Sequence, residues 1–84
     1  MGINDKDKSL IISPNPSNDF VKVNSPEMID YIRVFDMEGR EIMNQIGIHS
    51  DKTQFNVSSW KSGIYILELS TNNLIKRKKF VVNN

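Results

Sequence analysis

The sequence has 84 residues, with 11 lysine or arginine residues against 10 aspartate or glutamate residues, and it has no cysteine. A chain of this length forms one domain with a thin core, because it buries only about 60% of its unfolded surface. The near balance of charge excludes an overall field that draws the chain to nucleic acid or an anionic membrane, so any basic effect must be local, and the lack of cysteine excludes disulfides and thiolate metal sites.

The first nine residues are mostly polar, and we expect residues 1–9 to be a linker or a remnant of cloning ahead of a domain at residues 10–84. The longest uninterrupted apolar run, Ile64 to Leu67, is far shorter than the roughly 20 residues that span a bilayer. The sequence therefore predicts no direct insertion into a membrane.

Apolar and polar residues alternate along almost the whole chain, and no long window carries the residue spacing of a helix. We therefore predict an all-β chain. The alternating segments are residues 10–12, 19–23, 31–35, 40–46, 53–57, 63–69 and 76–82.

Proline, asparagine, aspartate and glycine separate these segments. Pro14-Asn15-Pro16 is expected to end the first strand, because closely spaced prolines remove two donors from the ladder, and Asn24-Ser25-Pro26 is expected to end the second. The segment from Asp36 to Gly39 is expected to be a tight turn, in which the aspartate bonds the backbone ahead of it and the glycine adopts a positive φ.

About seven short strands with a turn every eight to twelve residues or so are typical of a sandwich. The predicted fold is a small immunoglobulin-like β-sandwich of about seven antiparallel strands in two sheets. An irregular turn at residues 58–63 is expected to place Trp60 on the end of the core. The side chains expected to face the core are those of Ile11, Val21, Val23, Ile32, Val34, Ile42, Phe55, Val57, Trp60, Tyr65, Leu67, Leu69, Phe80 and Val82.

Basic residues form an uninterrupted run from Lys76 to Lys79 in the last predicted strand. Alternate residues of a strand point to opposite faces, which halves the density of any basic patch. Lysine also protects edge strands against aggregation, so we favour an edge strand over a phosphate site. Because no aromatic residues interleave with the run, the sequence argues against nucleic-acid binding.

The residue types of a hydrolytic triad occur in His49, Asp51, Ser58 and Ser59, but nothing in the pattern places a serine on a nucleophile turn. The segment from Asp36 to Gly39 is similar to the start of a calcium loop, yet the acidic ligands expected downstream are missing. We therefore predict a protein that is not an enzyme and that takes no cofactor or metal.

Four motifs follow one another along the chain: Pro14-Asn15-Pro16, residues 32–42, residues 55–65, and a lysine-rich segment that ends in Val81-Val82. With these motifs in this order, residues 10–84 resemble the type A C-terminal sorting domain of the type IX secretion system, also called the Por secretion system. The chain departs from the family pattern at two positions, since the family more often has an aliphatic residue at the position of Trp60 and aspartate at that of Asn56.

The resemblance implies a non-catalytic C-terminal targeting signal that directs a cargo protein across the outer membrane. The implied partners are an upstream cargo domain in the same parent chain, the outer-membrane type IX translocon with its shuttle components, and a sortase-like signal peptidase. The peptidase would remove the domain, and surface attachment would replace it. The implied location is the periplasm in transit and then the exterior or cell surface of a Gram-negative bacterium.

The resemblance also indicates where recognition takes place. The glycine and the tyrosine of the third motif additionally have structural reasons to be present, because a glycine feeds a tight turn into a strand and a tyrosine packs its ring inward. The positions most closely linked to export are Gly63, Tyr65, Lys79, Phe80, Val81 and Val82. The positions expected to form structural turns are Pro14, Asn15, Pro16, Asp36 and Gly39.

An alternative function is an immunoglobulin-like accessory module that binds carbohydrate or protein on a secreted enzyme or adhesin. Such modules usually expose a row of aromatic side chains that stack on sugars. Trp60 and Tyr65, by contrast, fall at positions that we expect to lie in the core. The exposure of the aromatic side chains therefore separates the two hypotheses.

Overall fold

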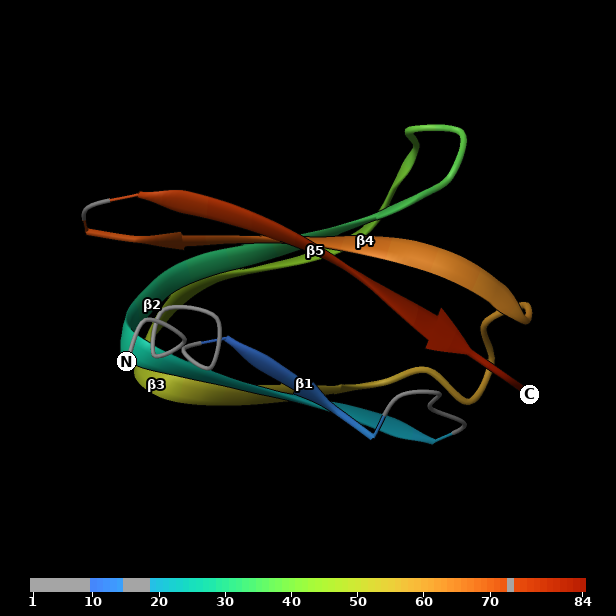
Figure 1. Cartoon of the computed structure of the whole chain (residues 1–84), viewed down its shortest axis with the longest axis horizontal. Helices are drawn as coiled ribbons and strands as arrows, with labels where there is room; N and C mark the ends of the chain where they lie inside the picture. The colour runs from blue at the N-terminus through green and yellow to red at the C-terminus, as the bar shows by residue number, and fades with distance from the viewer. Residues whose placement is uncertain (1–9, 15–18, 73) are drawn as a thin grey trace, which may run out of the picture.

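The structure, a computed structural model, describes residues 10–14, 19–72 and 74–84. These residues form antiparallel strands, and among them there is no helix that is long and apolar enough to cross a membrane. The expected linker at residues 1–9 lies outside the described residues. The five strands, coloured along the chain in Figure 1, are β1 (Ile11–Ser13), β2 (Phe20–Asp36), β3 (Glu41–Asn56), β4 (Gly63–Thr71) and β5 (Ile75–Val82).

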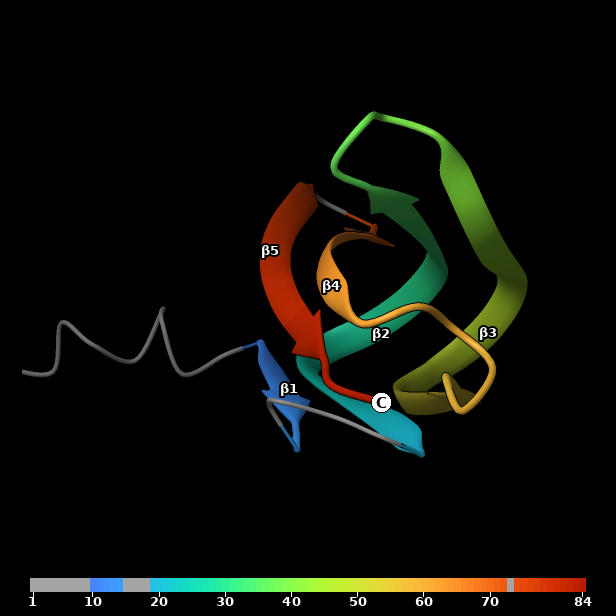
Figure 2. The same cartoon turned by 90° about the vertical axis from the view of Figure 1, so that its right-hand side faces the viewer.

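β2 is the strand around which the sheet is organised. Its first part, Phe20 to Asn24, pairs with β1 on one side and with the end of β3 on the other, and we call this set the lower layer. Its second part, Ile29 to Asp36, pairs with β4 and with the start of β3, and β5 adds to β4 to complete the upper layer. The sheet curls on itself, so that β1 lies below β4 and β5 (Figures 1 and 2).

The prediction of an all-β chain is confirmed, but the described residues form five strands in one curled sheet instead of about seven in two sheets. The predicted strands 19–23 and 31–35 are two parts of β2, and most of the predicted strands 40–46 and 53–57 lies in β3. Pro26 does not end β2, because the register shifts between Asn24 and Ile29 and the proline needs no ladder partner there.

β3 bends in step with β2. Gly47 has a φ of 65° and His49 a φ of 50°, and these left-handed residues lie where the register of the pair shifts. Across the bend, the Thr53 hydroxyl donates to the Gln45 side chain at 2.7 Å. β2 and β3 therefore stay paired with each other as both cross from one layer to the other.

Most of the predicted core is confirmed. Leu10, Ile12 and Ile29, which the sequence analysis did not select, are also buried, and Trp60 is half-buried against the cluster. The buried apolar side chains come from every strand and fill the space between the two layers. They are Leu10, Ile12, Val21, Val23, Ile29, Ile32, Val34, Phe55, Val57, Tyr65, Leu67, Leu69, Phe80 and Val82.

Two residues were assigned to the core wrongly. Ile11 is 47% exposed because β1 buries Leu10 and Ile12, which puts the residue between them on the opposite face. Ile42 is 40% exposed because Val34 pairs with Met43 while Phe35 pairs with Glu41, so that Ile42 is the extra residue of a bulge. A shift of one residue is enough to turn an aliphatic side chain outward.

Truncation of two isoleucines on neighbouring strands tests this assignment of faces. Ile32 is fully buried and Ile46, on β3, is 79% exposed. We expect Ile32→Ala to lower the free energy of unfolding by about 2–5 kcal/mol, because it leaves a cavity, and Ile46→Ala to change it by less than about 0.5 kcal/mol. Urea denaturation followed by tryptophan fluorescence measures both, and similar losses for the two variants would contradict the described register.

Candidate recognition surface on β4 and β5

The hairpin of β4 and β5 holds all of the residues predicted for export, and its register divides them between two faces. Gly63 starts β4 opposite Val82, and Tyr65 lies opposite Phe80. The side chains of Tyr65, Phe80 and Val82 point between the layers and are buried. Lys79 and Val81 lie on the outer face and are exposed. Only these last two side chains, with the neighbouring outer-face residues, are accessible to a partner.

Aromatic rings hold the buried side of the hairpin in place. Tyr65 packs on Trp60 at 5.0 Å and on Phe80 at 5.9 Å between ring centroids. Phe55 closes the ring of contacts, at 5.7 Å from Trp60 and 6.1 Å from Phe80. Such pairs stabilise a fold beyond the apolar area that they bury. Tyr65 and Phe80 therefore act first as structural residues.

Asn84 ties the segment after β5 to the turn at residues 57–62. Its side-chain Nδ2 donates to the Val57 carbonyl at 2.9 Å and to the Trp60 carbonyl at 2.6 Å. Its backbone N–H donates to Ser62 Oγ at 2.9 Å, and the Ser62 hydroxyl donates back to the Asn84 carbonyl at 3.0 Å. Sequence analysis missed this residue, because a single asparagine carries no pattern that identifies its partners.

Glu68 is 4% exposed although it lies on the outer face of β4. Its carboxylate is 2.9 Å from Arg77 Nη2 on β5 and 3.5 Å from Arg33 Nη1 on β2, and it accepts a hydrogen bond from the Tyr31 hydroxyl at 3.4 Å. Arg33 also pairs with Glu41 on β3 at 2.8 Å. A line of ion pairs therefore crosses the upper layer from β3 to β5, and the buried charge is compensated.

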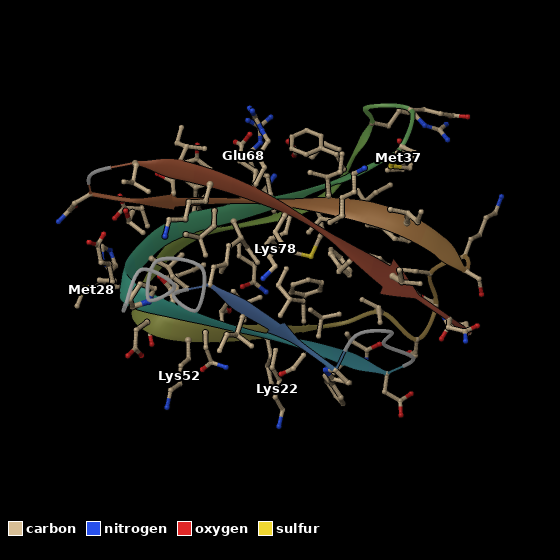
Figure 3. All side chains as sticks on the ribbon, in the orientation of Figure 1. Lys22, Met28, Met37, Lys52, Glu68 and Lys78 are labelled. Carbon is tan, nitrogen blue, oxygen red and sulfur yellow. The ribbon has the colours of Figure 1, made fainter. Side chains whose placement is uncertain are left out.

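The basic run of β5 is split between the two faces, as its alternation predicts. Arg77 and Lys79 lie on the outer face, opposite Glu68 and Ile66 of β4. Lys78 points the other way, and its Nζ donates to the Leu10 carbonyl at 2.9 Å. Figure 3 shows Glu68 and Lys78 on opposite sides of the β4–β5 hairpin. The run therefore forms no continuous basic patch.

The residue types of a triad lie in β3 and in the turn that follows it. His49 and Asp51 lie in β3, where His49 has one of the left-handed backbone conformations of the bend. The Ser58 hydroxyl donates to Asn56 Oδ1 at 2.6 Å and is part of the turn that starts there. Among the described residues, no group of three histidine, cysteine, aspartate or glutamate side chains is placed to hold a metal ion.

Comparison with known families identifies the domain. A family model described as the secretion system C-terminal sorting domain matches residues 11–83. The chain belongs to this family. Membership makes the chain a sorting signal of the type IX secretion system, which implies a larger cargo chain, contact with the secretion machinery and export to the surface or exterior of a bacterium. A search of curated proteins found no match.

The two departures of this sorting domain from the family pattern fit its structure. Asn56 Oδ1 accepts hydrogen bonds from the Ser58 backbone at 2.8 Å and from the Ser58 hydroxyl at 2.6 Å, so its amide oxygen does what an aspartate oxygen does in such a turn. Trp60 packs on Phe55 and Tyr65 at the end of the core. Both residues therefore keep the turn before β4 in place.

The turn between β2 and β3 forms as the sequence predicts. Asp36 Oδ1 accepts the backbone N–H groups of Glu38 and Arg40, both at 2.9 Å, and its Oδ2 is 3.1 Å from Arg40 Nε. Gly39 has a φ of 87°. Of the other predicted turn, Pro14 follows β1 directly, whereas Asn15 and Pro16 lie outside the described residues.

Removal of the Tyr65 hydroxyl tests the closed end of the sorting domain. This hydroxyl donates to the Lys61 carbonyl at 2.7 Å, whereas the Tyr31 hydroxyl is 3.4 Å from Glu68. We expect Tyr65→Phe to lower the free energy of unfolding by about 1 kcal/mol, and Tyr31→Phe by less, because its bond is longer. Urea denaturation measures the free energy of unfolding of both variants. If Tyr65→Phe is as stable as the parent, the bond to Lys61 is not a stabilising contact.

The turn at Asp36 predicts a dependence of stability on pH. The backbone N–H of Arg40 lowers the pKa of Asp36 below its ordinary value, and the Glu38 N–H and the Arg40 side chain add to this. A lowered pKa in the folded state gives stability that is present above the unfolded value, about 3.9, and is lost as the pH falls through the folded pKa.

We therefore expect Asp36→Asn to be less stable than the parent at pH 7, with the difference narrowing as the pH falls below about 4. Urea denaturation at a series of pH values measures this. Glu41, a carboxylate outside the turn, also has a pKa that is lowered by hydrogen bonds from Asn44 and Arg33. Glu41→Gln is therefore expected to show the same narrowing at low pH. A constant difference between Asp36→Asn and the parent at every pH would contradict the assignment.

Proposed function

We propose that this sorting domain is a non-catalytic signal that is read in the periplasm by the outer-membrane type IX translocon and its shuttle components. The observation that carries the proposal is the family match over residues 11–83. We further propose that a sortase-like peptidase cuts upstream of the domain and that surface attachment of the cargo replaces it.

The outer face of β4 and β5 is the surface that we propose for recognition. Ile64 lies opposite Val81, and Ile66 lies opposite Lys79. Ile64 and Val81 are exposed aliphatic side chains, and the side chain of Lys79 forms no ion pair or hydrogen bond with any described residue. An apolar pair beside a lysine suits a partner surface that presents apolar groups next to a carboxylate. Tyr65, Phe80 and Val82 support this face from beneath.

The alternative function, a carbohydrate-binding module, has less support. Phe55, Trp60, Tyr65 and Phe80 pack against one another and form no exposed row. Phe20 is exposed, but it lies in the other layer. Stacking on a sugar requires aromatic faces that are open to solvent. These four aromatic residues are therefore used for folding.

Fusion of residues 10–84 to an unrelated periplasmic protein tests the proposal. We expect the fusion to reach the medium or cell surface of a type IX-competent bacterium and to stay in the periplasm of a strain that lacks the translocon. Deletion of residues 80–84 is expected to trap the fusion, because it removes Phe80 from the core and Asn84 from its turn. Periplasmic retention of the intact fusion in competent cells would contradict the sorting function.

A second pair of variants tests the proposed face. We expect Lys79→Glu/Val81→Asp to lower the exported fraction about tenfold or more, as for the loss of about 1.4 kcal/mol of binding, while the domain stays folded. Lys61→Glu/Ile46→Asp makes the same kinds of change at exposed residues outside β4 and β5 and is the matched control. Equal export of both variants would place recognition elsewhere without affecting the sorting function.

A further inference from the structure

The outer face of the lower layer carries positive charge that the domain itself does not compensate. All three arginines of the chain form ion pairs with carboxylates. Lys22 and Lys52, by contrast, form no ion pair with any described residue. Figure 3 shows both lysines projecting from the lower side of the domain, opposite Glu68.

The register brings the two lysines together. Lys22 of β2 lies opposite Gln54 of β3, and Asn24 lies opposite Lys52, so that the lysines are diagonal neighbours on one face. Diagonal neighbours are about 7–8 Å apart, which allows both ammonium groups to contact one anion. The two carboxamides occupy the other diagonal. These side chains surround a shallow hollow of about 280 Å³ that is lined by Lys22, Val23, Asn24, Lys52, Thr53 and Gln54.

Apolar side chains flank the lysines on the same face. Ile11 of β1 lies opposite Asn24, and Phe20 lies two residues before Lys22 on β2. They are 47% and 45% exposed. The alternation of the strands places no carboxylate on this face, whose described members are Ile11, Ser13, Phe20, Lys22, Asn24, Lys52, Gln54 and Asn56.

We propose that this face docks reversibly on an anionic lipid surface. Lys22 and Lys52 contact lipid phosphate groups, with Asn24 and Gln54 as additional hydrogen-bond donors. Phe20 and Ile11 enter the boundary between headgroups and acyl chains. The paired lysines complement the negative charge of such a surface, and the flanking apolar side chains complement the apolar layer beneath its headgroups. The contact is peripheral, and it goes beyond the proposed sorting function because it uses the opposite layer.

Co-sedimentation of the 84-residue chain with vesicles tests the proposal. We expect binding at low salt to phosphatidylcholine vesicles that contain about one-third phosphatidylglycerol, weaker binding at high salt, and none to phosphatidylcholine alone. Lys22→Glu or Lys52→Glu should weaken the partition about fivefold or more, as for the loss of one lysine near the surface. Phe20→Ser should weaken it at all salt concentrations.

Lys61→Glu is the matched control, because it makes the same charge change at an exposed lysine in the turn between β3 and β4, outside the proposed docking face. At about 0.1 M salt its partition should stay within about twofold of the parent, because the Debye length is then about 10 Å and charges further than that from the lipid surface are screened. If Lys61→Glu and Lys22→Glu weaken the partition into vesicles equally, binding responds to net charge alone, and the proposal is overturned. An unchanged free energy of unfolding in urea establishes that each variant is folded.

Titration with inorganic phosphate separates a lipid headgroup from a free anion. Phosphate could change the NMR chemical shifts of the backbone amides at residues 22–24 and 52–54 while the chain does not partition into anionic vesicles. This result would assign the face to a soluble anion and overturn the lipid assignment. Failure to bind either vesicles or phosphate would overturn the proposal altogether. Neither result depends on export, so the sorting function is tested separately.

Discussion

The structure depends on the continuity of β2 through the bend between the two layers. This strand pairs with β1, β3 and β4, so every other strand except β5 is hydrogen-bonded to it. Its buried apolar residues are Val21, Val23 and Ile29 before the register shift between Ile29 and Tyr31, and Ile32 and Val34 after it. At this shift the buried positions of β2 change from odd-numbered to even-numbered residues. Without the change, the polar residues of the second part would face the inner side of the curl.

The local elements could be predicted from the sequence, whereas their continuity could not. Period-two alternation identified each part of β2 and β3, and the aspartate and glycine of the Asp36 turn predicted that turn. Pro26 and Gly47 looked like the ends of strands, since both residues are common where pairing stops. In the curled sheet they lie at register shifts, where a few residues lack a partner and pairing resumes further along the strand. Whether a proline ends a strand or lies in a bulge depends on the partner strand, which the local sequence does not specify.

The candidate site was predicted at the level of the hairpin but not of the face. The resemblance led us to expect recognition at the end of the chain, and the structure shows that Tyr65, Phe80 and Val82 are buried there while Lys79 and Val81 are exposed. Glu68 and Asn84 could not be found from the sequence. Glu68 is compensated by arginines on two different strands, and Asn84 bonds a turn more than twenty residues earlier in the chain. Both depend on tertiary neighbours that no short pattern encodes.

This division of the hairpin links the proposed recognition to folding. Ile64 and Val81 face solvent side by side only while the register of β4 and β5 holds, and that register is maintained by Phe80 in the aromatic cluster and by the bonds of Asn84. In an unfolded chain the same residues are separated by the whole hairpin, so a partner that contacts both must supply the free energy of ordering it. The outer face therefore reports the folded state of the domain, because the exposed residues are held in place by their buried neighbours.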